Sequence, residues 1–480
     1  MKPNPVASPL PRIQPEDLGI PSRAISSFVE ALGKTGQEIH SFILLRHGSV
    51  AAEAWWKPYA PVVPHQLYSL TKSFTSTAVG LAVGEGLLTL DDPVISFFPD
   101  NAPKRPSANL AAMRVRHLLT MSAGHARDAV DLASFYKVRD WVKAFFAAPV
   151  EHEPGTVFLY SNGASYMLSA IVQKLTGQRV ADYLAPRLFE PLGIAAPTWW
   201  ACPRGVNIGG FGLSLRTEDI AKFGQLLLQR GRWEDRQLLS EAWVEEATRG
   251  QVSNGDGGES DATQGYGYQF WRSRHGCYRA EGAFGQFCVV MPSQDAVLAM
   301  TGGAVNSQAI LDAAWTTLLP AMDGTVRVVK KHQAGLKRTL RSLRLDPPPF
   351  APPPENAPQM DSTTWMFDEN DAGLRSVTFS MKGGKLAMAI KSKRTTTLRF
   401  GAGRWAPGRA QRGDIGGAGP VRCAWTWTAS GALEATARYI ATPYRDTFEF
   451  RFTPDGLTLV IRSNVSFGTL ETKPMMARRA

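Results

Sequence analysis

Apolar residues recur every three or four positions in several segments of the first two-thirds of the chain. In residues 22–33, one face of a helix would carry Ile25, Phe28, Val29 and Leu32. Helix stops follow at Gly86, Gly177 and Gly231. This spacing predicts helices over residues 22–33, 69–85, 164–175, 180–189, 217–230 and 307–319.

The helix predicted over residues 69–85 differs from the others because it is rich in small side chains: Thr75, Ala78, Gly80 and Ala82. Small side chains let neighbouring elements approach closely. We therefore expect this helix to be central and buried.

Shorter apolar runs alternate with turn residues and predict strands. Residues 41–45 and 50–56 flank His47-Gly48, which is typical of a hairpin turn. Further strands are expected over residues 265–271, 276–281, 286–291 and 296–301. Strands at both ends of a helical middle predict an α+β domain, in which helices flank an antiparallel sheet and the middle forms a helical subdomain.

Proline-rich residues 347–355 divide the chain, and beyond them apolar residues alternate with period two. Such strands with glycine-rich turns predict a small, barrel-like, all-β domain at the C-terminal end. We expect a catalytic domain over residues 15–325, a basic and proline-rich linker over 326–358, and the β-rich domain over 359–480.

Composition narrows the class of protein. Apolar residues make up 44% and charged residues 20% of the 480 positions, as in folded water-soluble proteins. No run approaches the ~20 apolar residues of a membrane helix, and the proline-broken start does not resemble a signal peptide. We expect a cytoplasmic protein with reduced cysteines, although a periplasmic location stays open.

The positive charge lies in the C-terminal part, where residues 326–480 hold 25 Lys and Arg against 12 Asp and Glu. A basic surface of this kind is one feature of nucleic-acid-binding proteins. Because no nucleic-acid-binding motif accompanies the charge, we interpret it as a solvated surface and expect neither nucleic acid nor membrane as a partner.

The most informative segment is Ser69-Leu70-Thr71-Lys72, at the start of the small-residue helix. A spacing of three puts Ser69 and Lys72 on one face. There a partly buried lysine can become neutral and serve as a base, or stay charged and lower the pKa of a neighbouring group. The same spacing recurs in Ser134–Lys137, which continues into a charged sequence and is interpreted as an exposed helix.

Tyr160-Ser161-Asn162 forms a second motif. The Tyr160 phenol is suited to general acid–base catalysis and the Asn162 amide to holding a substrate carbonyl. The alternative is that these residues only cap the helix that follows.

Ala280-Glu281-Gly282-Ala283 enters a strand and forms a third motif. A glycine-rich strand edge lets a substrate lie alongside it, and the N–H groups of Ser69 and Ala283 are candidates for an oxyanion hole.

The order of these motifs resembles the serine β-lactamase and penicillin-binding-protein superfamily, and in particular its class C β-lactamase-like esterases, D-aminopeptidases and nylon-oligomer hydrolases. Residues 85–93, 116–124, 189–194 and 238–240 add to the resemblance, which covers roughly residues 15–320. It implies a β-lactamase/transpeptidase-like fold and an acyl-enzyme on Ser69. Lys72 and Tyr160 would move protons, and Asn162 would bind substrate. No metal or other cofactor is implied.

One position departs from the family pattern. The third motif usually reads Lys-Thr-Gly or His-x-Gly, but Ala280-Glu281-Gly282 stands here. Loss of a cation that binds a substrate carboxylate should weaken binding by about 1.5–3 kcal/mol. We therefore expect a hydrolase of small neutral or cationic esters or amides, in which Glu281 and Gly282 contact the substrate and Glu281 pairs with a substrate ammonium.

Two other functions stay open at this point. One is a D-aminopeptidase, amidase or weak β-lactamase that uses the same residues. The other is a non-catalytic ligand-binding or sensor protein with the same fold. The sequence does not indicate an oligomeric state.

Overall fold

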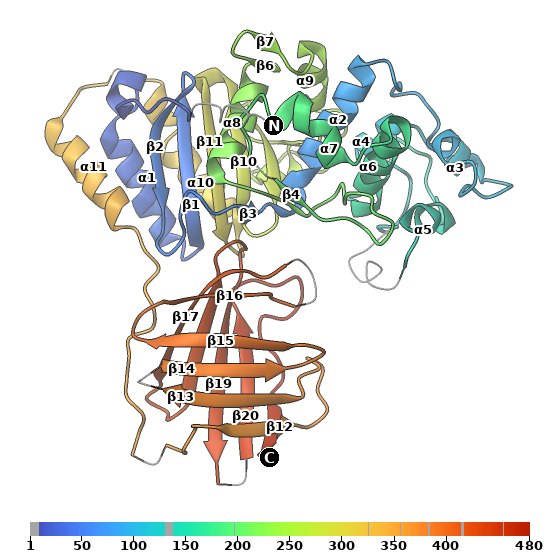
Figure 1. The fold of residues 1–480 in the computed structure, drawn as a ribbon. Coiled ribbons are helices and arrows are strands. Elements are labelled where there is room, and N and C mark those ends of the chain that lie inside the picture. Colours follow the sequence, from blue (N-terminus) through green and yellow to red (C-terminus); the bar gives the residue numbers. More distant parts are fainter. Residues whose placement is uncertain are drawn as a thin grey trace, which may run out of the picture.

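The computed structural model describes residues 9–129, 138–195, 197–324, 326–355, 357–382, 385–413, 417–454 and 456–480. Figure 1 shows a mixed helix-and-sheet domain above a β-barrel, with the barrel strands red and orange. The predicted α+β class with an additional β domain is confirmed. The second Ser-x-x-Lys sequence, residues 134–137, lies outside the described residues.

The central sheet of the first domain has six antiparallel strands in the order β2-β1-β11-β10-β9-β8. The first hairpin of the chain thus pairs with a strand more than 240 residues later, since β1 lies beside β11. The strands are β1 (Glu38–Arg46), β2 (Ser49–Trp55), β8 (Trp271–Arg272), β9 (Tyr278–Gly282), β10 (Gln286–Met291) and β11 (Ala296–Gly303).

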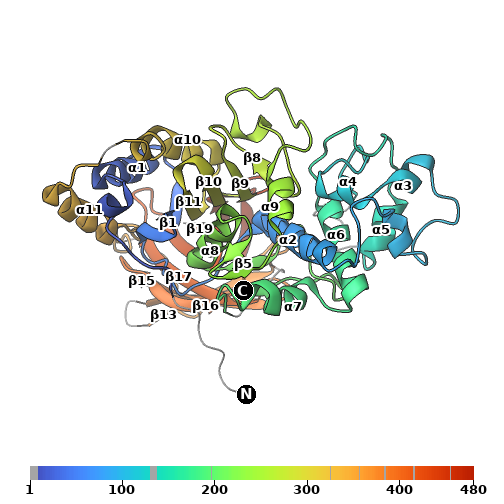
Figure 2. The same cartoon turned by 90° about the horizontal axis from the view of Figure 1, so that it is seen from above.

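Each face of this sheet carries an apolar core, since successive side chains of a strand point to opposite sides and both sets are apolar. On β1, Ile43 and Leu45 belong to one apolar core and Phe42 and Leu44 to the other. Helices on one side cluster at the edge of the domain, as Figure 2 shows. They are α1 (Ser22–Lys34), α10 (Ser307–Thr317) and α11 (Lys330–Ser342).

The opposite face packs against α8 (Thr217–Leu228), beyond which lie α2 (Thr71–Gly84) and the helical subdomain. Helix α2 is buried along nearly its whole length, as its small side chains predict. A Cβ at Gly80 would lie 2.4 Å from the Trp243 indole, so glycine lets α9 (Glu241–Thr248) approach. The remaining helices are α3 (Ala108–Ala112), α4 (Val115–Leu119), α5 (Trp141–Ala147), α6 (Asn162–Thr176) and α7 (Val180–Leu184).

Short strands connect these helices. A three-stranded sheet joins the segment before α2 to the loop that follows the subdomain, since β3 pairs with β5 and β5 with β4. Its strands are β3 (His65–Gln66), β4 (Thr198–Trp199) and β5 (Leu213–Leu215), and a separate two-stranded sheet consists of β6 (Arg232–Trp233) and β7 (Arg236–Gln237).

The C-terminal barrel is a ten-stranded sheet within the described residues, closed where β15 also pairs with β17. Its alternating apolar residues, among them Phe379 and Phe450, fill the interior. The strands are β12 (Thr363–Phe367), β13 (Ser376–Lys382), β14 (Lys385–Lys391), β15 (Thr395–Ala402), β16 (Ala406–Ala410), β17 (Gly419–Trp427), β18 (Leu433–Tyr439), β19 (Arg445–Thr453), β20 (Gly456–Ser463) and β21 (Met475–Arg479).

Two segments differ from the sequence prediction. Residues 265–271 form no long strand, because Gln269 adopts a φ of 65° and its N–H bonds to Leu119. The apolar alternation there reflects Tyr266, Tyr268 and Phe270, which are buried from an irregular backbone. The segment 326–358, expected as a linker, begins with α11, which packs on α1 through its buried Leu336.

No helix in the described part of the chain is both long and apolar enough to cross a membrane. The four cysteines are free and buried.

Candidate active site

The predicted nucleophile, Ser69, lies in a single 3-10 turn, Tyr68–Leu70, directly ahead of α2. Tyr68 has a φ of 51°, a left-handed conformation that redirects the chain into the helix. The end of β9 presses against this turn, since a Cβ at Gly282 would lie 1.9 Å from the Leu67 carbonyl oxygen. Only glycine therefore permits the predicted third motif to reach the serine turn.

Lys72 lies one helical turn after Ser69 and is 1% exposed. Its Nζ is 3.2 Å from Ser69 Oγ, 2.8 Å from Asn162 Oδ1 and 2.8 Å from the Gly210 carbonyl oxygen. Burial lowers the pKa of Lys72 to about 7, against the opposing effect of the Asp128 carboxylate.

These contacts suit a neutral amine as well as an ammonium. An uncharged Lys72 can donate its two hydrogens to Asn162 and Gly210 and direct its lone pair at the Ser69 hydroxyl. Since the pKa of Lys72 is about 7, a large fraction of the protein carries this amine near neutral pH. The arrangement can remove the proton of Ser69 without a histidine.

Tyr160 lies just ahead of α6, with its ring 4.7 Å from Lys72 Nζ. Burial raises the pKa of Tyr160 well above its usual range, although a hydrogen bond with Ser69 acts in the opposite direction. The phenol therefore stays protonated and is suited to deliver a proton rather than to act as a phenolate base. Its ring also stacks on Trp271, at a centroid distance of 5.3 Å.

Asp128 holds the second motif in place, and no sequence pattern predicted this role. Its carboxylate accepts hydrogen bonds from Ser161 Oγ at 2.7 Å, Asn162 N at 2.8 Å and Gly163 N at 3.0 Å. The first turn of α6 thus has an anionic cap, which favours helix formation. Because Asp128 precedes the motif by more than 30 residues, only the fold brings them together.

The acid of the third motif has a partner within the chain. Glu281 Oε2 accepts a hydrogen bond from Arg279 Nε at 2.6 Å, and the Arg279 side chain is 2% exposed. Arg279 Nη1 contacts the backbone carbonyl oxygens of Asp261 and Arg272 and the hydroxyl of Ser273. Glu281 is thus neutralised by a buried arginine, which reduces the negative charge that it offers to a substrate ammonium; its predicted contact with substrate stays a prediction.

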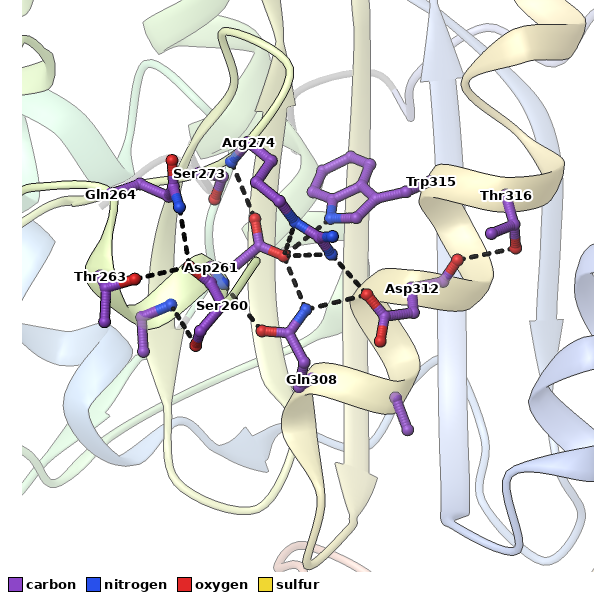
Figure 3. Close-up of polar contacts among 12 residues, drawn as sticks. Ser260, Asp261, Thr263, Gln264, Ser273, Arg274, Gln308, Asp312, Trp315 and Thr316 are labelled. Carbon is purple, nitrogen blue, oxygen red and sulfur yellow. Dashed lines mark hydrogen bonds and ion pairs between the residues drawn. The ribbon is translucent and has the colours of Figure 1, made fainter. Parts of the chain in front are cut away.

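A second buried carboxylate, that of Asp261, lies next to Arg279. Figure 3 shows Asp261 between the loop that carries Arg274 and helix α10. Asp261 is 1% exposed and accepts hydrogen bonds from Arg274, from Gln308 Nε2 at 2.7 Å and from Trp315 Nε1 at 2.9 Å. Because its carbonyl also binds Arg279, Asp261 fixes the arginine that pairs with Glu281.

The three predicted motifs therefore meet at one place. Ser69, Tyr160, Asn162 and Ala283 are partly exposed around the buried Lys72. Ala283 follows Gly282 at the end of β9, next to the serine turn, where its predicted oxyanion role would require it. A partly exposed hydroxyl beside a buried amine and a protonated phenol is a set of groups suited to acyl transfer.

The chain is similar to known hydrolases. The Beta-lactamase family model matches residues 29–315. The 6-aminohexanoate-dimer hydrolase of Paenarthrobacter ureafaciens is 26% identical over 281 residues, which cover 54% of this chain and 71% of that protein. Esterase EstB of Burkholderia gladioli is 26% identical over 175 residues, covering 32% of this chain and 44% of that protein.

Among solved structures, the octameric penicillin-binding protein homologue from Pyrococcus abyssi has a TM-score of 0.51 at 17% identity, over 95% of this chain and 99% of that chain. This likeness of fold extends over both domains. Since the family match covers more than half of the sequence, the chain belongs to the beta-lactamase family and is a serine hydrolase.

Proposed function

We propose that this serine hydrolase cleaves small esters or amides through an acyl-enzyme on Ser69, in the manner of a carboxylesterase. The observation that carries the proposal is the buried Lys72 Nζ, 3.2 Å from Ser69 Oγ, with a pKa of about 7. A neutral amine in this position can take the serine proton as the hydroxyl attacks a carbonyl carbon.

The remaining groups complete a balanced reaction. The N–H groups of Ser69 and Ala283 would bind the oxyanion of the tetrahedral intermediate. As the intermediate collapses, Tyr160 would donate its proton to the leaving oxygen or nitrogen and recover one from Lys72. A water molecule then attacks the acyl-enzyme while neutral Lys72 takes its proton. The same proton passes from Lys72 to Ser69 Oγ as the acid leaves, which restores free Ser69.

The third motif favours neutral substrates over β-lactams. Glu281 stands where related enzymes carry part of a cationic motif, and its charge is offset by Arg279. A substrate carboxylate would thus meet no free lysine from this motif, which lowers its affinity by about ten- to a hundredfold. β-Lactams carry such a carboxylate, so we propose that their hydrolysis is slow.

Amide hydrolysis is the second candidate, and the state of Tyr160 favours it. An amine is a poor leaving group unless it is protonated, and the raised pKa of Tyr160 keeps a proton available. The similarity to the 6-aminohexanoate-dimer hydrolase supports the same candidate.

Chromogenic substrates distinguish these reactions. We would compare p-nitrophenyl acetate, a D-alanyl p-nitroanilide and nitrocefin with the wild type, Ser69→Ala and Ser76→Ala. The control residue Ser76 lies on the same helix, buried and with no hydrogen-bond partner for its hydroxyl among the described residues. Its removal should leave the activity unchanged.

The proposal expects ester turnover in the wild type and Ser76→Ala, its loss in Ser69→Ala, and little cleavage of nitrocefin. Anilide cleavage faster than ester cleavage would instead assign the amidase function. Fast nitrocefin cleavage would contradict the argument from the third motif. A wild-type protein that turns over none of the substrates and forms no covalent adduct with a fluorophosphonate would favour a ligand-binding role.

A further inference from the structure

Four aromatic rings from both domains meet beside the serine turn. We call Tyr68, Phe284, Tyr444 and Phe467 the interdomain aromatic cluster. Tyr68 lies 5.4 Å from Phe284 and 5.7 Å from Phe467 between ring centroids, and Phe284 lies 4.7 Å from Phe467. Tyr444 completes the group, 5.9 Å from Phe284. These distances are typical of interacting aromatic pairs.

The cluster directly flanks the proposed reacting groups. Tyr68 precedes Ser69, and Phe284 follows Ala283, so each candidate oxyanion donor has a cluster residue as its neighbour in sequence. Both aromatic residues have left-handed backbones, with φ of 51° at Tyr68 and 70° at Phe284. Non-glycine residues adopt this conformation at a cost of about 1–2 kcal/mol, and such strain concentrates at functional sites.

At one end of the cluster, hydrogen bonds connect the barrel to the segment around Tyr68. Tyr68 donates a hydrogen bond to the Tyr444 hydroxyl at 2.7 Å, and the Gln66 N–H donates to the Ala441 carbonyl at 2.9 Å. The Arg412 guanidinium lies 3.7 Å from the centroid of the Tyr444 ring and pairs with Asp446. The barrel is therefore joined to the segment that carries the nucleophile.

The other end of the cluster is open. Phe467 is 59% exposed and lies between β20 and β21, although its ring contacts Tyr68 and Phe284. Residues 463–470 contain no charged side chain, in a C-terminal region with 25 basic and 12 acidic residues. The Leu470 side chain in the same segment is also exposed, at 46%. An uncharged segment that exposes Phe467 and Leu470 beside the proposed reacting groups matches an uncharged ligand with an apolar group.

We propose that the interdomain aromatic cluster is a substrate subsite, and that it takes an aromatic group carried by the ester or amide substrate. This inference rests on the proposed function and specifies its substrate class. The barrel then contributes directly to specificity, through Phe467 and Tyr444, because half of the subsite belongs to it.

The test uses pairs of esters that differ by one phenyl group. For the acyl half, ethyl propionate is compared with ethyl 3-phenylpropionate; for the alcohol half, ethyl acetate is compared with 2-phenylethyl acetate, all in a pH-stat. Phe467→Ala should lower kcat/KM for at least one phenyl-bearing ester by about 2- to 12-fold, which corresponds to about 0.5–1.5 kcal/mol of ring contact. Its parent ester should change by less than about twofold on the same scale.

Met366→Ala is the matched control, because Met366 is an exposed apolar residue of β12 in the same barrel. It should not alter the phenyl preference. The half of the ester that responds identifies which part of the substrate occupies the cluster. Equal losses for all four esters, or no loss for any, would overturn the subsite.

A binding measurement separates this inference from the proposed function. Ser69→Ala protein should bind 2-phenylethyl acetate or 3-phenylpropionate ethyl ester at least about twofold more tightly than Ser69→Ala/Phe467→Ala protein, measured by calorimetry. Failure of the proposed function appears as wild-type turnover that is absent or independent of Ser69. Failure of the subsite appears as equal binding by these two proteins.

Discussion

The proposed mechanism makes the pH dependence of turnover depend on a single buried amine, that of Lys72. If neutral Lys72 accepts the proton of Ser69, kcat/KM should follow the fraction of Lys72 that is unprotonated in the free enzyme. Burial lowers the pKa of Lys72 to about 7. The activity should therefore rise with pH across neutrality, with the midpoint of its acid limb near this value.

The magnitude follows from the titration. With a pKa of about 7, roughly a tenth of Lys72 is neutral at pH 6 and roughly nine-tenths at pH 8. We predict a roughly tenfold fall in kcat/KM when the pH is lowered from 8 to 6. Lys72→Arg should be inactive throughout, because a guanidinium does not lose its proton in this range.

The assay is hydrolysis of a neutral p-nitrophenyl ester, followed at a wavelength where the product absorbs equally in both protonation states. Enzyme held at pH 6 and returned to pH 8 must recover full activity, so that unfolding does not imitate the titration. A rate that is constant from pH 6 to 9, or one that falls as the pH rises, would refute the role of Lys72 as base.

Three further predictions concern residues that support the site. Asp128→Asn should move the acid limb of the pH–kcat/KM curve to lower pH, because the Asp128 carboxylate raises the pKa of Lys72. An acid limb at the wild-type pH would contradict this effect of Asp128 on Lys72. Asp261→Ala should destabilise the fold by about 3 kcal/mol in urea unfolding, because it leaves the buried Trp315 N–H without its acceptor and removes one of the two acids that pair with Arg274; a change below about 1 kcal/mol would contradict this. Gly282→Ala should abolish turnover, since its Cβ would meet a carbonyl oxygen at 1.9 Å, whereas Gly33→Ala, with open space around it, should retain full activity.

The proximity of the proposed reacting groups was predictable because local sequence determines their spacing. Ser69 and Lys72 are one helical turn apart, and the small side chains that follow them predicted a buried helix, as found. The strand that ends at Gly282 was predicted from its apolar run and glycine-rich end.

The supporting groups were not predictable because long-range packing brings them together. Asp128 contacts a helix that begins more than 30 residues later, and Arg279 is placed by the Asp261 loop. Tyr444 reaches Tyr68 from 376 positions away in the sequence. No short pattern marks such contacts, since they depend on the register of the sheet and on the docking of the barrel.

The central claim is that Ser69 is the nucleophile, and covalent labelling tests it most directly. Wild-type protein and the Ser69→Ala and Ser76→Ala variants would be treated with a fluorophosphonate and examined by intact mass and peptide mapping. The account predicts one adduct, on Ser69, in the wild type and in Ser76→Ala, and none in Ser69→Ala. An adduct that persists in Ser69→Ala, or that maps to another residue, would contradict it.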